Sequence, residues 1–274
     1  MAVEAGVRAD FSDPDEAALT RALARVCSMD SRRWISFLLD ALPRVGELAE
    51  KDLSPTQVRW LRMFQVTLFP EAKGERLERD TLRDLARAMS NRVLGQELLD
   101  LLRWQLDHID FVDEPVDPGF ACPLDLHCQY TRDQIFVGLD YLNPGVVRQG
   151  VKWLPEKGCD VLINTLNKSE RDYSPTTMYE DYSISESLFH WQSQSTTSET
   201  SRVGQRYVHH RELGTKVLLF VREWRTDAAG TAPFTFLGLV DYLSHEGSRP
   251  MSVVWRLERP MPAKFLRRSN RLAG

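Results

Sequence analysis

The sequence has 274 residues, of which 42% are hydrophobic and 27% charged, with 15 Gly and 14 Pro. These ordinary values exclude collagen-like, coiled-coil and wholly disordered chains, and no apolar run approaches the roughly 20 residues that a membrane-spanning helix needs. The formal net charge is −4, and four cysteines are too few for a disulfide framework in a chain of this length, so we expect a soluble cytoplasmic protein.

The first 110 residues predict a small helical bundle. Apolar side chains recur every three to four residues after Ser31 and after the Ser54-Pro55 pair, and again within 80–89 and 93–108. Serine before the first helical residue and proline at that residue are typical helix starts. The predicted helices carry three tryptophans that we expect to pack in the core, Trp34, Trp60 and Trp104.

The acidic, proline-rich stretch 113–118 predicts a linker, so we divide the chain into a helical domain at 1–115 and a second domain at 116–274. A helix is predicted at 133–142. Strand patterns follow in the second domain, at 124–129, 150–154, 160–165, 216–222, 233–242 and 251–257. Strands at such spacing with few helices favour a compact barrel, and the fold class expected is α+β.

Charge is distributed unevenly between the two halves. Residues 1–120 hold 16 Lys and Arg against 22 Asp and Glu, whereas residues 121–274 hold 19 against 17. Seven basic residues and one acidic residue, Glu258, lie within 249–271. This asymmetry permits an anionic ligand on the second half without requiring one.

Sequence motifs give no support for catalysis. The chain has no GxxxxGK[ST], GxGxxG, HExxH or GxSxG pattern. The spacing of Cys122, Cys128 and Cys159 is not that of a structural zinc site. We therefore expect a protein without enzymatic activity, metal ion or cofactor.

The stretch 167–207 is the most informative part of the chain. It is too polar for a core and richer in Tyr and Trp than disordered segments normally are. Aromatic faces among hydrogen-bonding side chains suit a flat polar ligand such as a nucleobase, although carbohydrate sites share this composition.

Three segments carry a resemblance to a known domain: HCQYTRDQI, TLNKSERDYSPTTMYEDYSISESLFHWQSQSTTSE and FLGLVDYLSHEGSRPMSVVWRLERPMP. Over residues 121–266 the chain resembles the C-terminal, target-sensing part of modification-dependent (type IV) restriction enzymes, which also carry a phospholipase-D-like nuclease and a helicase. The resemblance implies recognition of methylated cytosine in DNA. Because the HxK and Walker motifs of those enzymes are missing from this sequence, it implies binding without cleavage.

Residues 161–266 also resemble the YTH domain, a PUA-like barrel that holds a methylated base in an aromatic cage. The shared features are a Trp in FHWQS, the strand VLLFVRE, an F-x-G strand and a second Trp in VVWRL, with Leu266 eleven positions later. The resemblance implies a YTH-like (PUA-superfamily) β-barrel with flanking helices. It assigns the base cage to Trp191 and Trp255, with Leu266 beside them. Tyr173 and Tyr182 are further candidates to line this cage or to support the loop around it.

Further candidate contacts fall into two sets. Contacts to the base edge are expected among Thr165, Asn167, Ser169, Asp181, Gln192 and Ser193. Contacts to phosphates are expected among Arg202, Arg206, His209, Arg211, Lys264, Arg267 and Arg268.

The resemblance thus predicts a nucleoid-associated reader of double-stranded DNA containing 5-methylcytosine, which flips the modified base into the cage. A reader of methylated RNA and a targeting subunit of a restriction nuclease complex remain open as alternatives. A nuclease or helicase partner and no membrane association are expected.

Overall fold

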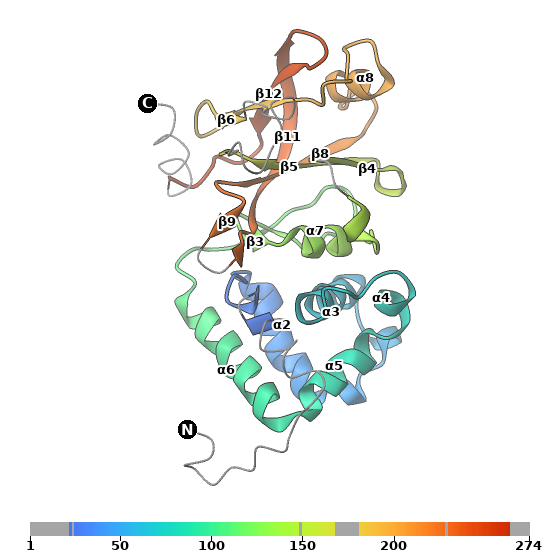
Figure 1. Cartoon of the computed structure of the whole chain (residues 1–274), viewed down its shortest axis with the longest axis vertical. Helices are drawn as coiled ribbons and strands as arrows, with labels where there is room; N and C mark the ends of the chain where they lie inside the picture. The colour runs from blue at the N-terminus through green and yellow to red at the C-terminus, as the bar shows by residue number, and fades with distance from the viewer. Residues whose placement is uncertain (1–21, 24, 148–149, 168–180, 228–229, 264–274) are drawn as a thin grey trace.

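The computed structural model describes residues 22–23, 25–147, 150–167, 181–227 and 230–263. Figure 1 shows helices at one end of the molecule and a curved sheet at the other, with the short helix α7 (Arg132–Gly138) between them. The α+β class is as predicted.

The first part of the chain contains the helices α2 (Arg32–Ala41), α3 (Pro55–Leu68), α4 (Glu75–Arg79), α5 (Thr81–Ser90) and α6 (Arg92–His108). Short 3-10 turns follow α2 at Leu42–Glu47 and Glu50–Asp52. The predicted starts are confirmed, because Ser31 accepts a hydrogen bond from the Trp34 amide and Ser54 forms a capping box with Gln57. None of the described helices has the length and apolar character needed to cross a membrane.

The tryptophans of the helical part do not share one environment. Trp34 is buried and donates from Nε1 to the Trp60 carbonyl at 3.1 Å, while Trp60 donates to the Pro123 carbonyl at 2.8 Å. The core position predicted for Trp104 is wrong, since this side chain is 53% exposed. It stacks on His108 one turn later, on the outer side of α6, at a ring distance of 4.1 Å.

The main sheet has the strand order β4-β5-β8-β11-β12-β7-β6, and β3 also pairs with β11. Only β5 and β8 run parallel among the described pairings. The strands are β3 (Gln129–Tyr130), β4 (Val151–Leu154), β5 (Cys159–Thr165), β6 (Tyr182–Ser183), β7 (Leu188–Gln192), β8 (Lys216–Arg222), β11 (Phe234–Glu246) and β12 (Ser252–Leu257). Small pairs are formed by β1 (Glu114–Pro115) with β2 (Asp125–Leu126) and by β9 (Thr226–Asp227) with β10 (Gly230–Thr231).

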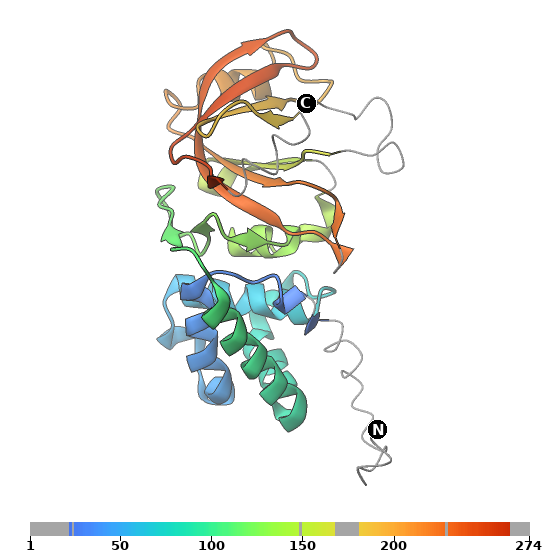
Figure 2. The same ribbon diagram turned by 90° about the vertical axis from the view of Figure 1, so that its left-hand side faces the viewer.

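The predicted closed β-barrel is wrong. The sheet ends at β4 on one side and at β6 on the other, and no ladder joins these strands within the described ranges. Closure requires hydrogen bonds between the two edge strands along matching lengths, whereas β6 has two residues and β4 has four. The sheet is strongly curved but open, as the view in Figure 2 shows.

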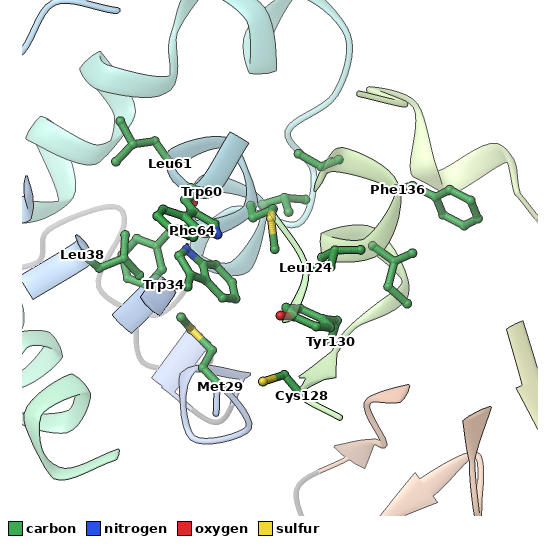
Figure 3. Close-up of a cluster of buried hydrophobic side chains, with 14 of the residues drawn as sticks. Met29, Trp34, Leu38, Trp60, Leu61, Phe64, Leu124, Cys128, Tyr130 and Phe136 are labelled. Carbon is green, nitrogen blue, oxygen red and sulfur yellow. Dashed lines mark hydrogen bonds between the residues drawn. The ribbon is translucent and has the colours of Figure 1, made fainter. Parts of the chain in front are cut away.

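The two faces of the sheet belong to different cores. The outer face packs against α7 and the helical part in one large cluster that crosses the predicted boundary near residue 115. Figure 3 shows Met29, Trp34 and Phe64 of the helical part facing Leu124 and Tyr130 of the second part. The division into two domains remains a prediction, but the described parts share a continuous apolar core.

The inner face of the sheet has a core of its own. Its members alternate along the strands, as Val217, Leu219 and Val221 of β8 illustrate, and helix α8 (Arg202–Val208) adds Tyr207. Strands β6 and β7 and helix α8 come from the polar segment in which the sequence pattern predicted no regular structure. This inner face holds the aromatic residues of the candidate site.

Candidate nucleic-acid interface

Three aromatic rings meet on the inner face, and we call Trp191, Tyr207 and Trp255 the aromatic cluster. Trp191 comes from β7, Trp255 from the neighbouring β12, and Tyr207 from α8. The ring centroids of the two tryptophans lie 6.1 Å apart at 48°, and Tyr207 meets both edge-on at 5.3 and 6.2 Å. All three side chains are at most 2% exposed. The structure therefore brings the two predicted cage tryptophans together, in mutual contact.

Trp255 carries an unsatisfied polar atom. Its indole Nε1 is buried and has no hydrogen-bond partner among the described residues. A buried donor without a partner costs about 1–3 kcal/mol, so each such atom calls for an explanation. Arg62 Nε and His127 Nε2 are two further atoms of this kind in the described structure. On the same inner face, Asn164 is 4% exposed and its amide Nδ2 also lacks a partner. Trp255 and Asn164 thus each bring an unpartnered donor to the inner face of the sheet.

His210 forms one wall beside Trp255, with ring centroids 6.0 Å apart. Its Nε2 accepts a hydrogen bond from the Tyr242 amide at 3.0 Å, so the neutral ring carries its proton on Nδ1, which faces the Thr215 carbonyl. Burial lowers the pKa of His210. The histidine is thus a neutral, fixed wall of the cluster rather than a cation.

The predicted base-edge residues are engaged in contacts within the protein. Thr165 accepts from Arg222 Nε at 2.9 Å, and the Asn167 amide donates to the Glu223 carbonyl at 3.1 Å. Both lie where the parallel strands β5 and β8 end side by side. Thr165 belongs to the outer face, because it alternates with the inner-facing Asn164.

The remaining base-edge residues lie near the end of β7. Asp181 accepts a hydrogen bond from the Gln192 amide at 2.9 Å, which joins the residues before β6 to β7. Ser193 is buried, accepts from the Met251 amide at 2.8 Å and donates to the Gln194 carbonyl. These contacts hold the segment that follows Trp191. Ser169 lies outside the described residues.

Tyr182, another predicted cage residue, does not join the aromatic cluster. Tyr182 is 44% exposed and stacks on His190 at 4.5 Å, as its cross-strand neighbour. Since adjacent residues of a strand point to opposite faces, His190 and Tyr182 lie on the side away from Trp191. Tyr173 and Leu266 lie outside the described residues.

The predicted phosphate contacts include two arginines that form ion pairs within the protein. Arg206 binds the buried Asp160 through two hydrogen bonds, and Arg211 binds Asp241 in the same way. The other two described candidates lie in and just after α8, where Arg202 is exposed and His209 contacts Glu212 at 3.0 Å. The rest of this set lies outside the described residues, namely Lys264, Arg267 and Arg268.

The buried cysteines and the possible metal ligands can be assessed in the described part of the chain. Burial raises the pKa of Cys122 to about 11 and raises those of Cys128 and Cys159 further, so these thiols do not ionise near neutral pH. Within the described ranges, no three His, Cys, Asp or Glu side chains group as metal ligands do.

Residues 124–268 match the family described as a domain of unknown function (DUF3427). The match covers more than half of the chain. The chain belongs to the DUF3427 family. No curated protein matches it. The DUF3427 region contains the whole aromatic cluster and both unpartnered donors, and it begins just before β2.

Sequence reasoning missed two residues of this site. Asn164 is the third member of the alternating set that includes Leu162, so a strict count along the predicted strand 160–165 indicates its inward direction. His210 has no comparable local signal. It reaches Trp255 only because the turn after α8 lies against β11.

Proposed function

We propose that this chain is a reader of 5-methylcytosine in double-stranded DNA, which binds the modified base after it has turned out of the duplex and does not cut the strand. The observation that carries the proposal is the unpartnered Nε1 of Trp255 within the aromatic cluster. Cytosine offers two acceptors, O2 and N3, to such a donor. The resemblance to target-sensing domains of modification-dependent restriction enzymes supports the choice of base.

The free-energy cost of turning the base out of the duplex is similar in size to the gains from binding it. Turning a base out of the duplex costs a few kcal/mol, and each stacking contact returns about 1–3 kcal/mol. Satisfying the buried indole donor removes a further cost of about 1–3 kcal/mol. The methyl group adds only about 0.8 kcal/mol by burial, which is less than a factor of ten in affinity. Hydrogen bonds to the base edge must therefore supply part of the selectivity, above all the discrimination of 5-methylcytosine from thymine, which carries the same methyl group.

Base entry requires the two tryptophans to separate. A base between parallel rings needs about 7 Å from one ring plane to the other, twice the usual contact distance of aromatic carbons. The centroids of Trp191 and Trp255 are 6.1 Å apart and the rings are tilted by 48°. We infer that the closed cluster is the free form and that the base replaces the contact between the rings.

The test measures the affinity of the full chain for four labelled probes: a duplex with 5-methylcytosine, the same duplex with 5-hydroxymethylcytosine, the unmodified duplex, and a methylated RNA. The proposal expects the tightest binding to the 5-methylcytosine duplex. Preference for the RNA, or equal affinity for methylated and unmodified duplexes, would overturn it. Incubating methylated plasmid with divalent metal ions checks the expected absence of cleavage.

The variant Trp255→Phe isolates the indole donor, because it removes Nε1 and keeps an aromatic ring. Its affinity for the methylated duplex should fall about tenfold, the equivalent of one lost hydrogen bond of roughly 1.4 kcal/mol. Thermal stability reports separately on folding. The matched control is Trp104→Phe on the exposed side of α6, which should bind all probes like the parent chain.

A further inference from the structure

The amide of Asn164, in the second half of β5, is buried without a hydrogen-bond partner for its nitrogen. The side chain is 4% exposed, and Nδ2 has no acceptor among the described residues. A buried donor left unpaired lowers the stability of a fold, and nearly all buried polar groups in proteins have a partner. Asn164 is therefore a candidate contact for a bound ligand.

The side chain of Asn164 points to the inner face of the sheet. Successive residues of β5 alternate between the two cores, since Val161 and Ile163 belong to the outer one and Leu162 to the inner one. Asn164 has the direction of Leu162, and its partner on β8, Val221, also belongs to the inner core. This inner core is the one that contains the aromatic cluster, on the curved sheet seen in Figure 2.

Asp160, four residues earlier on the same face of β5, shows how another buried polar group is satisfied there. Its carboxylate accepts two hydrogen bonds from Arg206, whose guanidinium lies 5.8 Å from the centre of the Tyr207 ring. One end of this row of side chains thus adjoins the aromatic cluster. At the other end of the row, Nδ2 of Asn164 has no comparable partner within the described ranges.

An amide matches the hydrogen-bonding edge of cytosine. Nδ2 donates and Oδ1 accepts, whereas cytosine accepts at N3 and donates from its N4 amino group. Thymine carries the same methyl group but has the opposite pattern at this edge, because its N3 bears a hydrogen and its O4 accepts. An amide held in one orientation therefore pairs with cytosine and places donor against donor when it meets thymine.

We propose that Asn164 reads the edge of the cytosine that has turned out of the duplex, and that it distinguishes 5-methylcytosine from thymine. This inference rests on the proposed function and deepens it, because burial of the methyl group contributes equally for the two bases. The amide nitrogen is unpaired in the free protein and gains its acceptor in the complex. Asn164 thus contributes specificity and lowers the stability of the free protein.

Asn164→Leu tests this inference, because it replaces the amide by an apolar group of similar shape. The full chain and the variant are compared on two labelled duplexes, one with 5-methylcytosine opposite guanine and one with thymine opposite guanine. The variant should lose at least about tenfold in affinity for the first duplex and keep its affinity for the second. Its melting temperature without DNA should equal or exceed that of the parent chain, because an unpaired buried amide has been removed.

The matched control is Thr165→Val, at the next residue of β5. Thr165 is 5% exposed and accepts a hydrogen bond from Arg222 on the outer side of the sheet. Its replacement should lower the melting temperature and leave the ratio of the two affinities unchanged. A second variant, Asn164→Ala, cannot overfill the site and should lose affinity for the 5-methylcytosine duplex as Asn164→Leu does.

The outcomes separate this inference from the proposed function. If the parent chain binds methylated and unmodified duplexes equally, the proposed function fails and Asn164 has no base to read. If the parent prefers the methylated duplex and both Asn164 variants keep its affinity, the reader stands and this inference fails. Equal losses for the two duplexes would also overturn it, as would a clear fall in the melting temperature of Asn164→Leu with an unchanged ratio of affinities.

Discussion

Arg206 of α8 donates two hydrogen bonds to Asp160 of β5, from Nε at 2.6 Å and from Nη2 at 2.8 Å. The carboxylate is almost completely buried, and the guanidinium also lies 4.1 Å from the centre of the Trp153 ring. The pair attaches the helix that carries Tyr207 to the first long strand of the sheet. Arg206 was a predicted phosphate contact, and its geometry is that of a structural ion pair.

Arg206→Gln should therefore destabilise the fold. Removing one partner of a buried ion pair leaves an uncompensated charge and costs about 3–5 kcal/mol. Chemical denaturation measures this loss. The control is Arg211→Gln, since Arg211 is an exposed partner of Asp241 and exposed pairs contribute little to stability. If Arg206→Gln instead leaves stability unchanged and lowers the slope of log DNA affinity against log salt concentration, Arg206 contacts a phosphate.

Stability should depend on the protonation of His210. Burial lowers the pKa of this group below its ordinary value, and the nearby Arg211 and Lys216 lower it further, while Asp241 at 3.7 Å and the Thr215 carbonyl raise it. The folded state keeps the ring neutral, whereas the unfolded chain takes up a proton near pH 6.5. The neutral His210 ring therefore contributes fully to the stability of the fold above about pH 6.5. This contribution is lost as the pH falls through the pKa that His210 has in the folded state.

Melting temperatures at pH 7.5 and 5.5 check this expectation. The decrease between the two should be smaller in His210→Gln than in the parent chain, although it should not vanish, because burial also lowers the pKa of His127. His209→Gln changes an adjacent histidine that pairs with Glu212 at the surface and should keep the parental decrease. An identical decrease in all three proteins would contradict the assignment.

Gly204 in α8 should not tolerate a side chain. A Cβ atom at this position would lie 2.1 Å from the Ser198 carbonyl oxygen and 3.0 Å from Met251 Sδ. The nearest atom belongs to the backbone, so relief requires α8 to shift. Gly204→Ala is expected to cost about 1–3 kcal/mol.

The matched substitution is Gly145→Ala, which meets no atom within 4 Å and should change stability by no more than about 0.5 kcal/mol. Thermal unfolding of both variants measures the difference. Equal stability of the two would show that the backbone around Ser198 relaxes without cost.

The described helical part and the sheet should unfold together. Ser31 donates to Asp125 at 2.6 Å and Gln134 donates to Thr67 at 2.7 Å, and both hydrogen bonds are buried and cross the boundary near residue 115. The apolar cluster around them is also shared. Calorimetry should give one transition with equal calorimetric and van't Hoff enthalpies. Two separated transitions would favour independent domains.

Local features of this protein could be read from its sequence. The capping box at Ser54 and Gln57 needs residues three positions apart, and the strand predicted at 216–222 coincides with β8. Such signals involve neighbouring residues only, so they do not depend on the rest of the fold. The pairing of Trp191 with Trp255 was expected from a family resemblance and not from local pattern.

Tertiary structure alone decided how the strands and charges are used. Closure of the sheet depends on the lengths and curvature of its edges, and the two-residue β6 leaves it open. The partner of Arg206 lies 46 residues away, and the buried hydrogen bond between Ser31 and Asp125 joins residues 94 positions apart. Composition gives only the number of charged residues in a chain. Only packing determines which charges pair inside the protein and which stay at its surface.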